Sequence, residues 1–284
     1  MGKGAGIVIF GIVLSIAGAA TAAVCGKKAY DDYKKYDKYK SGEFTLKESN
    51  KITLDAAAGT MNVHRSETGT SYVKYNVLEM YDVKYDEEEN EVKMKRKWMW
   101  NFVVFSWAST SKSTVDVYLT DKEYDAYFEL SAGEFNVEDD FTFSSLTINV
   151  SAGTFNYKKD MTVNDDANIR ISAGDLNIDG KTTVNDDANI RISAGDLTIK
   201  NLEAKHVDVR VSAGDATLSR VTSDDIKFKI SAGDLNMNIV GNKLDYTIDI
   251  DKSAGECNVK DNEGGSKKLD GKISAGSATI NFID

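Results

Sequence analysis

Hydrophobic and polar residues alternate along most of the chain, with period two on both sides of a recurring tripeptide, Ser-Ala-Gly. One copy shows the pattern clearly, because Ile169 and Ile171 precede the tripeptide and Leu176 and Ile178 follow it. Side chains of a strand point to alternate faces, whereas those of a helix repeat every three or four residues. The pattern therefore predicts two short strands joined at the tripeptide, each with one buried face.

The tripeptide recurs at intervals of 19 to 22 residues. A period of this length indicates stacked structural repeats, each of which buries its apolar residues against its neighbours. We predict an all-β, single-chain β-solenoid, similar to a parallel β-helix, with coils of about 20 residues. The predicted corners are Ser131, Ser151, Ser172, Ser193, Ser212, Ser231, Ser253 and Ser274, with Gly133, Gly153, Gly174, Gly195, Gly214, Gly233, Gly255 and Gly276.

Other repeat folds share part of this signal. Leucine-rich repeats have a similar period, but the chain lacks their leucine pattern, and calcium-binding nonapeptide repeats recur every nine residues. A near-copy of the corner occurs at Ala57-Ala58-Gly59. Residues 162–176 are identical to residues 183–197, which fits a stack that gains coils by duplication.

Each corner residue has an expected structural role. Glycine adopts a positive φ without steric cost, so it can turn the chain sharply. Alanine fits a tight interior, and the serine hydroxyl can bond a backbone group at the bend. Cys257 falls in the same inward column as Leu235, and we expect it to be a small buried hydrophobic side chain.

The residues before the regular repeats form a second β-rich part. In residues 44–130 the tripeptide is weaker, and longer alternating segments flank an acidic run at residues 86–90. That run predicts a hairpin turn. Because a stack of coils otherwise exposes an apolar end, we expect residues 44–130 to cap the regular repeats of residues 131–284.

One stretch of this part carries apolar groups on both faces. It includes all three tryptophans, and basic residues precede it. A strand buried on both sides is the favoured interpretation, and the alternative is an exposed patch that contacts a membrane, a glycan or a protein. The candidate interaction residues are Trp98, Trp100, Phe102, Phe105 and Trp107.

Charged residues recur at two outward positions beside the corner. An acid stands three residues after the serine in most copies, and a base stands two residues before it in several copies. A ladder of carboxylates can bind Ca²⁺, but no calcium ligand geometry is visible, so we favour ion pairing between the two columns. The columns are Glu134, Asp175, Asp196, Asp215, Asp234 and Glu256, and Arg170, Arg191, Arg210 and Lys229.

Two further polar columns are expected to be structural. Asparagine or threonine occurs five residues after every corner serine, as at Asn156 and Asn177, and such ladders form hydrogen bonds between strands. Aspartate pairs such as Asp186-Asp187 recur at the opposite turns. Repeated aspartates in turns are typical of solvated turn chemistry rather than of a catalytic pair.

The chain begins with an uncharged segment that is long enough to cross a bilayer. Residues 5–25 predict a transmembrane helix within residues 1–26, and a charged linker follows at residues 27–43. Ala20-Thr21-Ala22 resembles a signal peptidase site, but we favour a retained anchor. Lysines after the segment argue for repeats inside the cell, whereas its position at the extreme N-terminus argues for export. We expect a single-pass cell-membrane protein with its repeats outside the cell.

Composition narrows the possible partners. The formal net charge of −10 and the pI near 4.9 argue against a nucleic acid, because phosphate binding needs a basic face. The two cysteines and the two histidines, His64 and His206, are too scattered to indicate a metal or cofactor site. The absence of proline fits a chain made mostly of hydrogen-bonded strand.

The repeats resemble the bacterial putative-adhesin family of β-strand repeats, a domain of unknown function that includes the membrane-anchored LiaG-like proteins. The resemblance rests on Ser-Ala-Gly-Asp-Leu-Asn, which begins at Ser172 and at Ser231, on Thr-Val-Asp-Val-Tyr-Leu at residues 114–119, and on the N-terminal segment. It covers about residues 44–284 and implies a β-solenoid-like fold, frequent membrane attachment and occurrence in the cell envelope. No catalytic residue comes with the family.

We therefore expect a non-enzymatic, membrane-anchored protein of the cell envelope that serves as an adhesin or surface scaffold. The alternative is an accessory protein of envelope-stress signalling that acts with a membrane sensor, supported by small residues at Gly11, Ser15, Ala19 and Ala23. An enzyme of the pectate-lyase or glycosidase type lacks the unrepeated inward carboxylate pair that it would need. No catalytic residue, cofactor or metal ligand is assigned.

Overall fold

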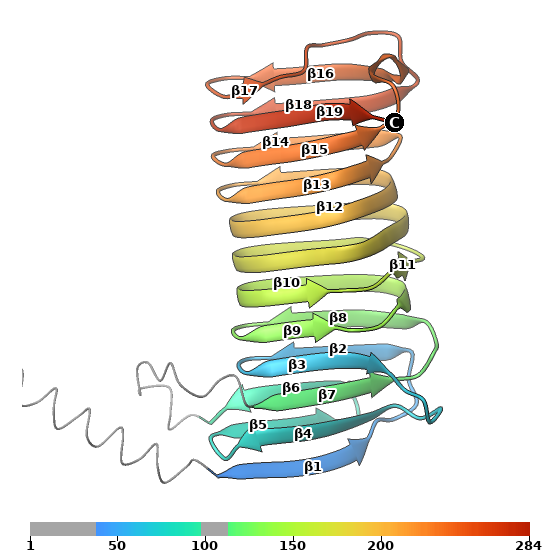
Figure 1. Cartoon of the computed structure of the whole chain (residues 1–284), viewed down its shortest axis with the longest axis vertical. Helices are drawn as coiled ribbons and strands as arrows, with labels where there is room; N and C mark the ends of the chain where they lie inside the picture. Colours follow the sequence, from blue (N-terminus) through green and yellow to red (C-terminus); the bar gives the residue numbers. More distant parts are fainter. Residues whose placement is uncertain (1–37, 98–112) are drawn as a thin grey trace, which may run out of the picture.

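The computed structural model describes residues 38–97 and 113–284, and the strands of these residues join in one 19-stranded sheet (Figure 1). The prediction of an all-β fold is confirmed. The first strands are β1 (Tyr39–Thr45), β2 (Lys51–Ala56), β3 (Thr60–Arg65), β4 (Tyr72–Leu78), β5 (Tyr81–Asp86), β6 (Glu91–Arg96) and β7 (Thr114–Leu119). The middle strands are β8 (Tyr124–Leu130), β9 (Glu134–Val137), β10 (Phe141–Tyr157), β11 (Met161–Val163), β12 (Ala167–Val211) and β13 (Asp215–Thr222).

The last strands are β14 (Asp225–Ile230), β15 (Asp234–Val240), β16 (Tyr246–Lys252), β17 (Glu256–Cys257), β18 (Lys267–Ile273) and β19 (Ser277–Ile283). A single turn of 3₁₀ helix, η3 (Lys243–Asp245), precedes β16.

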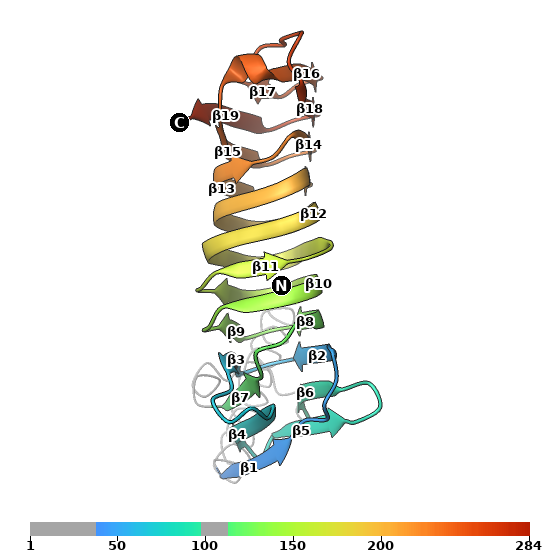
Figure 2. The ribbon, with the colours of Figure 1, turned by 90° about the vertical axis from the view of Figure 1, so that its right-hand side faces the viewer.

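The sheet winds into coils whose strands form two facing walls (Figures 1 and 2). The strand that leads into each corner lies in the first wall, and the strand that leaves it lies in the second wall. Successive coils pair in parallel, so that Ile148 lies beside Ile169 in the first wall and Phe155 lies beside Leu176 in the second. β11 adds a short third ladder with β10 and β12. β10 and β12 are long because β10 continues through one corner and β12 through two.

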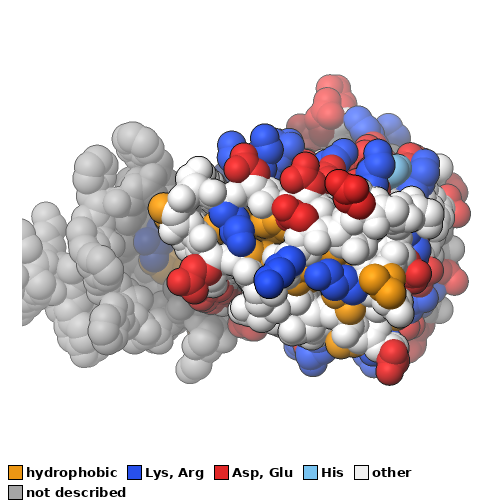
Figure 3. All heavy atoms as spheres, turned by 90° about the horizontal axis from the view of Figure 1, so that it is seen from above, with side chains coloured by type: hydrophobic (Ala, Val, Ile, Leu, Met, Phe, Trp, Pro, Cys, Tyr) orange, Lys and Arg blue, Asp and Glu red, His pale blue; other side chains and the backbone are white. Residues whose placement is uncertain are grey.

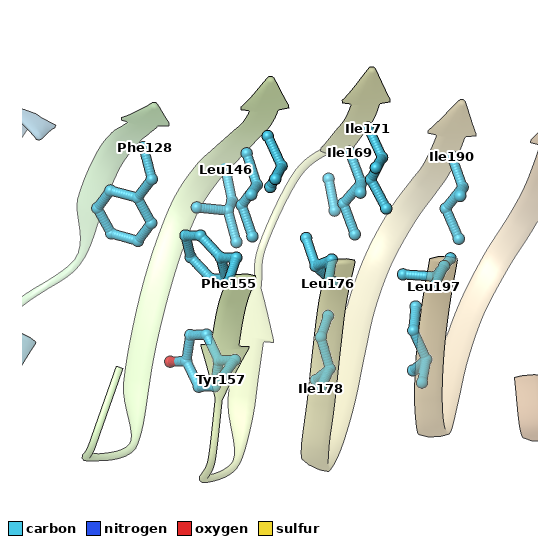
Figure 4. Close-up of a cluster of buried hydrophobic side chains, with 14 of the residues drawn as sticks. Phe128, Leu146, Phe155, Tyr157, Ile169, Ile171, Leu176, Ile178, Ile190 and Leu197 are labelled. Atoms are coloured by element: carbon cyan, nitrogen blue, oxygen red, sulfur yellow. The ribbon is translucent and has the colours of Figure 1, made fainter. Parts of the chain in front are cut away.

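Inward side chains of the two walls meet and form a continuous core (Figure 4). Phe128 of the first wall lies 5.3 Å, between ring centroids, from Phe135 of the second wall. Phe135 in turn stacks on Phe155 of the next coil at 4.7 Å. All three rings are fully buried, and burial of each such side chain contributes roughly 1.5–3 kcal/mol. The period-two alternation therefore produces the core that holds the walls together.

At the N-terminal end, chain order and spatial order differ. β2 and β3 pair directly with β8 and β9, although residues 66–123 separate them in sequence. On the other side, β2 pairs with β6 and β3 pairs with β7. The coil formed by β2 and β3, with Ala57-Ala58-Gly59 at its corner, is therefore an internal coil of the stack (Figure 1). The regular stack begins before residue 131.

Antiparallel strands close this end. β4 pairs antiparallel with β7, β1 pairs antiparallel with β4, and β5 pairs antiparallel with β6. Asp86 lies opposite Glu91, which confirms the hairpin turn expected at residues 86–90. Asn90 occupies the left-handed region at φ 50°, and its side chain donates a hydrogen bond to the carbonyl of Lys51 at 2.6 Å. The turn is thereby tied to the neighbouring coil.

At the C-terminal end, the last coil of the chain is not the last coil of the stack. β18 and β19 pair with β14 and β15 on one side and with β16 and β17 on the other. The coil formed by β16 and β17 therefore ends the rod, and the last coil lies beneath it (Figure 1). Asn262 forms an antiparallel bridge with Ile248 and covers the outer edge of β16. Protection of this kind prevents pairing with other chains.

Candidate interaction surfaces

The corner glycines form a column in which each backbone contacts the next. A methyl group on Gly195 would lie 2.2 Å from the carbonyl oxygen of Gly174, and one on Gly133 would lie 2.2 Å from that of Gly59. Gly195 has a φ of +118°, whereas Gly174 lies outside the left-handed region. The requirement shared by the whole column is therefore close backbone contact between coils, and a positive φ is an additional requirement at some positions.

The alanines and serines of the corner do not have the roles expected from the sequence. The alanines are exposed, except for the half-buried Ala152, because the chain bulges outward where it changes wall. No hydroxyl of the corner serines takes part in a hydrogen bond with the described residues. Instead the backbone continues the ladder, as where the Ser212 amide donates to the Ile192 carbonyl at 2.8 Å. The corner is therefore a structural stacking device.

Asparagines of the column on the second wall form a hydrogen-bonded ladder from Asn62 to Asn177, which confirms the prediction for this part of the column. Thr198, Thr217 and Thr279 form no side-chain hydrogen bond with the described residues. The amide nitrogen of each asparagine donates to the amide oxygen of the preceding one, at 3.0 Å from Asn136 to Asn62, 3.0 Å from Asn156 to Asn136 and 3.1 Å from Asn177 to Asn156. Asn62 then donates to Asp116 at 2.8 Å. The amide groups are thus used between coils.

The expected ion pairs across the corner are absent from the described residues, so this prediction was wrong. Arg210 pairs with Asp208 at 2.7 Å instead of with Asp215. The reason is the corner itself, which carries the chain from one wall to the other. Arg210 is exposed on the first wall, and Asp215 is exposed on the second. The two walls lie on opposite sides of the rod (Figure 2).

Each charged position instead forms an exposed column of like charge. The order of the coils places Lys229 between Arg210 and Lys272, because β18 pairs with β14. We call the positively charged set the basic column and the negatively charged set the acidic column. The basic column on the first wall consists of Arg170, Arg191, Arg210, Lys229 and Lys272. The acidic column on the second wall consists of Asp175, Asp196, Asp215 and Asp234. At its ends the acidic column is interrupted, since Thr154 separates Glu134 from Asp175 and Ser277 separates Asp234 from Glu256.

The aspartates of the opposite turns bind backbone amides of neighbouring coils. Asp140 accepts from the Asp160 amide at 2.9 Å, and Asp160 accepts from the Lys181 amide at 2.7 Å. Asp166 likewise accepts from the Asp187 amide at 3.2 Å. These carboxylates therefore stabilise the turns, in agreement with the turn chemistry expected from the sequence.

One group at these turns has metal-ligand chemistry. Ligand atoms of Asp186, Asp187 and His206 lie within 4.8 Å of one another. The group lies at the turn edge and away from the acidic column, where the sequence suggested calcium. Asp186 already pairs with Lys205 at 3.1 Å, and His206 Nδ1 lies 3.5 Å from Asp225. The sequence does not reveal the group, because coils of 19 and 21 residues bring Asp187 beside His206 only once they are stacked.

A second arrangement that the sequence did not indicate is an aromatic stack on the second wall near the N-terminal end. His64 lies 5.1 Å from Tyr118, and Tyr118 lies 4.5 Å from Tyr72, between ring centroids. Burial is the main cause of the raised pKa of Tyr118. The ammonium of Lys74 lies 5.1 Å from the Tyr72 ring. The stack arises from the antiparallel pairing of β4, which the alternation pattern alone does not reveal.

The hollow on the first wall near the C-terminal end has a volume of about 560 Å³. Its lining carries both signs of charge, including Asp208, Lys227, Asp270 and Lys272. These groups are distributed over three strands, β12, β14 and β18. Such an arrangement suits contact with an extended surface better than catalysis on a small substrate.

The sequence matches the model of the Toastrack family DUF4097 over residues 49–283. The chain belongs to this family. The match begins after β1 and covers β2 to β19, so the resemblance seen in the repeats extends to the described strands on both sides of them. No curated protein matches the sequence.

Solved structures are similar to this chain. A crystal structure of a putative adhesin from Bacteroides fragilis covers 87% of this chain and 98% of its own, with 16% identity and a TM-score of 0.55. A putative adhesin from Parabacteroides merdae covers 87% of this chain and 97% of its own, with 13% identity and a TM-score of 0.49. At such identities the likeness concerns the fold alone.

Several predictions for this Toastrack chain fall on residues outside the described ranges. These are the anchor at residues 5–25 and the candidate interaction residues Trp98, Trp100, Phe102, Phe105 and Trp107. Among the described residues, no helix is long and apolar enough to cross a membrane. The anchor and the aromatic patch therefore stay predictions.

Proposed function

We propose that this Toastrack protein is a non-enzymatic β-solenoid of the cell envelope, held in the membrane by residues 5–25, with its walls displayed outside the cell for adhesion or scaffolding. The observation that supports this proposal is the distribution of outward polar side chains. They form columns along the coils, in which neighbouring groups repeat the same chemistry instead of combining an acid, a base and a nucleophile. Repetition of this kind suits an extended binding surface.

The related structures agree with this proposal at the level of their names. The Bacteroides fragilis protein that shares the fold is called a putative adhesin. An uncharged segment of 21 residues before the rod adds a means of attachment.

Protease shaving of intact cells tests the location. The full chain would carry an epitope after Asp284, at the C-terminus of the last coil, and a cytoplasmic protein of the same cells would serve as control. We expect the epitope to be lost while the control survives. An epitope that survives until the cells are lysed would contradict an extracellular rod.

Fractionation of the same cells tests the anchor. The full chain should stay in the membrane pellet after a high-salt wash, and a variant without residues 1–26 should not. Release of the full chain by salt would show that attachment is electrostatic and would contradict a retained transmembrane segment.

A further inference from the structure

The basic and acidic columns run beside the same corner edge of the rod, one on each wall. Their members lie on adjacent strands, about 4.8 Å apart, as shown by the pairing of Arg210 with Lys229 and of Asp215 with Asp234. The two columns therefore have the same spacing, and they face in opposite directions.

Neither column is fully neutralised within the described part of the chain, although Arg210 pairs with Asp208 and Asp251 lies opposite Lys272 on the next strand. Like charges on neighbouring strands destabilise a sheet, so a column of this kind normally requires counter-charges. Within residues 38–97 and 113–284, Arg210 is the one basic-column member with an ion pair, and the four acids have none. Asp234 accepts hydrogen bonds from Ser277, which leaves its charge unpaired. Both columns are open to charges of another molecule.

We infer that this molecule is a second copy of the same chain, and that rods associate side by side with the first wall of one against the second wall of the next. A copy moved perpendicular to the walls, without rotation, keeps its corner edge on the same side. Its acidic column then lies opposite the basic column of the first copy. The matching spacing lets several pairs form at once.

Two alignments give four pairs each. With the copies level, Arg170, Arg191, Arg210 and Lys229 face the acidic column in order. With one copy displaced by one strand spacing, Arg191, Arg210, Lys229 and Lys272 face it in order. The second alignment depends on the placement of the last coil, which brings Lys272 into the basic column.

The positions beside the columns favour a copy over a linear polyanion. Next to the basic column, the first wall carries three acids, Asp208, Asp270 and Asp249, and one base, Lys227, so this row is net negative and would repel a polyanion. In the stacked arrangement these carboxylates face the uncharged column of the second wall, which includes Thr217 and Asn236 and can donate hydrogen bonds.

The contact is heterologous, because each rod uses one wall to bind and offers the other to a further copy. Such contacts produce open rows when no rotation closes them. This step deepens the proposed function and takes from it the shared orientation of copies tethered to one membrane. The contact itself needs neither the tether nor a particular side of the membrane, so its test is independent of protease shaving.

Sedimentation velocity of the full chain in detergent tests the inference. One variant reverses the whole basic column, Arg170→Glu, Arg191→Glu, Arg210→Glu, Lys229→Glu and Lys272→Glu. The other reverses the whole acidic column, Asp175→Lys, Asp196→Lys, Asp215→Lys and Asp234→Lys. We expect wild-type association at about 20–100 mM salt that weakens toward about 500 mM, as the Debye length shortens.

Each variant alone should associate at least about tenfold more weakly than wild type, since in either alignment the four attractive pairs become repulsive ones. A mixture of the two variants should regain association, because the reversed columns complement each other. Both variants remain net acidic, so attraction between net charges cannot explain that recovery. Melting curves like that of the wild type establish that each variant is folded.

Three results would overturn the inference: a monomeric wild type throughout this salt range, a basic-column variant that associates like wild type, or a mixture that does not recover. Binding of inorganic polyphosphate that is lost in the basic-column variant, with a monomeric wild type, would assign this surface to a polyanion instead.

Carbodiimide cross-linking measures the register. The reagent joins a lysine amine and a carboxylate as an amide with loss of water, so it reports direct ion pairs. We expect Lys229 to link to Asp234 of another copy in the level alignment, or to Asp215 in the displaced one. Lys229→Arg keeps the charge and should lose the link but not the association. Intermolecular links that avoid both columns would contradict the proposed contact.

Discussion

The middle of the rod and its two ends obey different rules of assembly. In the middle, every coil pairs with its neighbours in sequence, as where β12 pairs with β13 and β14. At the ends, strands far apart in the chain lie side by side, as β2 lies beside β8 and β18 lies between β14 and β16. A repeat therefore specifies how coils stack, but it does not specify which coil follows which.

Removing the last coil should have the largest effect. Deletion of residues 267–284 takes away the buried side chains of Leu269, Ile273 and Ile280 and also leaves β16 and β17 without a parallel partner. We expect a loss of roughly 5 kcal/mol or more in unfolding free energy, since each such side chain contributes roughly 1.5–3 kcal/mol. Hydrogen exchange should show unprotected amides in residues 246–252 as well.

The matched control deletes residues 246–266, which form the end coil and the segment that covers it. Residues 241–245 remain to connect β15 to β18, and the last coil keeps its pairing with β14 and β15. This variant should melt at a higher temperature than the truncated chain. A truncated chain that melts at the same temperature as the control, or above it, would contradict the spatial order of the last three coils.

Substitutions in the glycine column should have the next largest effect, and they separate backbone contact from backbone conformation. Gly195→Ala combines a contact of 2.2 Å with a φ of +118°, Gly174→Ala has a contact of 2.6 Å without a positive φ, and Gly241→Ala has a φ of +124° in open space. We expect losses of about 3–5 kcal/mol, about 1–3 kcal/mol and about 1–2 kcal/mol, respectively.

Denaturant unfolding of the three variants measures these losses. Gly241→Ala serves as the control for conformation alone. Equal losses for Gly195→Ala and Gly241→Ala would show that the positive φ governs the column. That result would support the turning role expected from the sequence and contradict the role of close backbone contact between coils.

Local structure could be predicted from the sequence because its causes are local. The alternation of Ile169, Ile171, Leu176 and Ile178 determines which face is buried, and the corner glycine marks the change of wall. The order of the end coils depends on contacts without such a signal. Gly271, for example, occupies a core position because the Phe228 ring of the adjacent coil fills the space, and a methyl group on Gly271 would lie 2.2 Å from that ring.

The candidate surfaces show the same division. The asparagine ladder was predictable, since position five after the serine repeats without interruption. The absence of ion pairs between the basic and acidic columns was not predictable, because sequence separation does not show that Arg170 and Asp175 lie on opposite walls. At the C-terminal end, viewed along the rod, acidic and basic side chains are intermixed (Figure 3). Which of them become neighbours depends on the order of the coils.

Breaking the asparagine ladder should have a smaller effect on the middle of the rod. Asn156→Ala removes the hydrogen bonds to Asn136 and from Asn177, which lie at 3.0 and 3.1 Å. Each hydrogen bond contributes about 0.5–1.5 kcal/mol, so we expect a loss of about 1–2 kcal/mol. Asn189→Ala, on the first wall, removes an amide that forms no side-chain hydrogen bond with the described residues and should cost less. Equal shifts in melting temperature would show that the ladder adds no stability.

The smallest expected effect concerns an ion pair at the N-terminal end. Lys40 of β1 donates to Asp82 of β5 at 2.9 Å, and this hydrogen bond is the main cause of the lowered pKa of Asp82. Because the folded pKa lies below the unfolded value, the pair stabilises the fold above about pH 4, and the stabilisation is lost as pH falls through the folded pKa. Both side chains are about one-third exposed, so Asp82→Asn should cost only a few tenths of a kcal/mol at pH 7.

The difference in unfolding free energy between Asp82→Asn and wild type should shrink as the pH is lowered toward about 2.5. The control, Glu87→Gln in the exposed turn, should show no difference from wild type at pH 7. A difference that stays constant between these pH values would mean that Asp82 contributes through packing, and the N-terminal end would then resemble the middle of the rod in what holds it together.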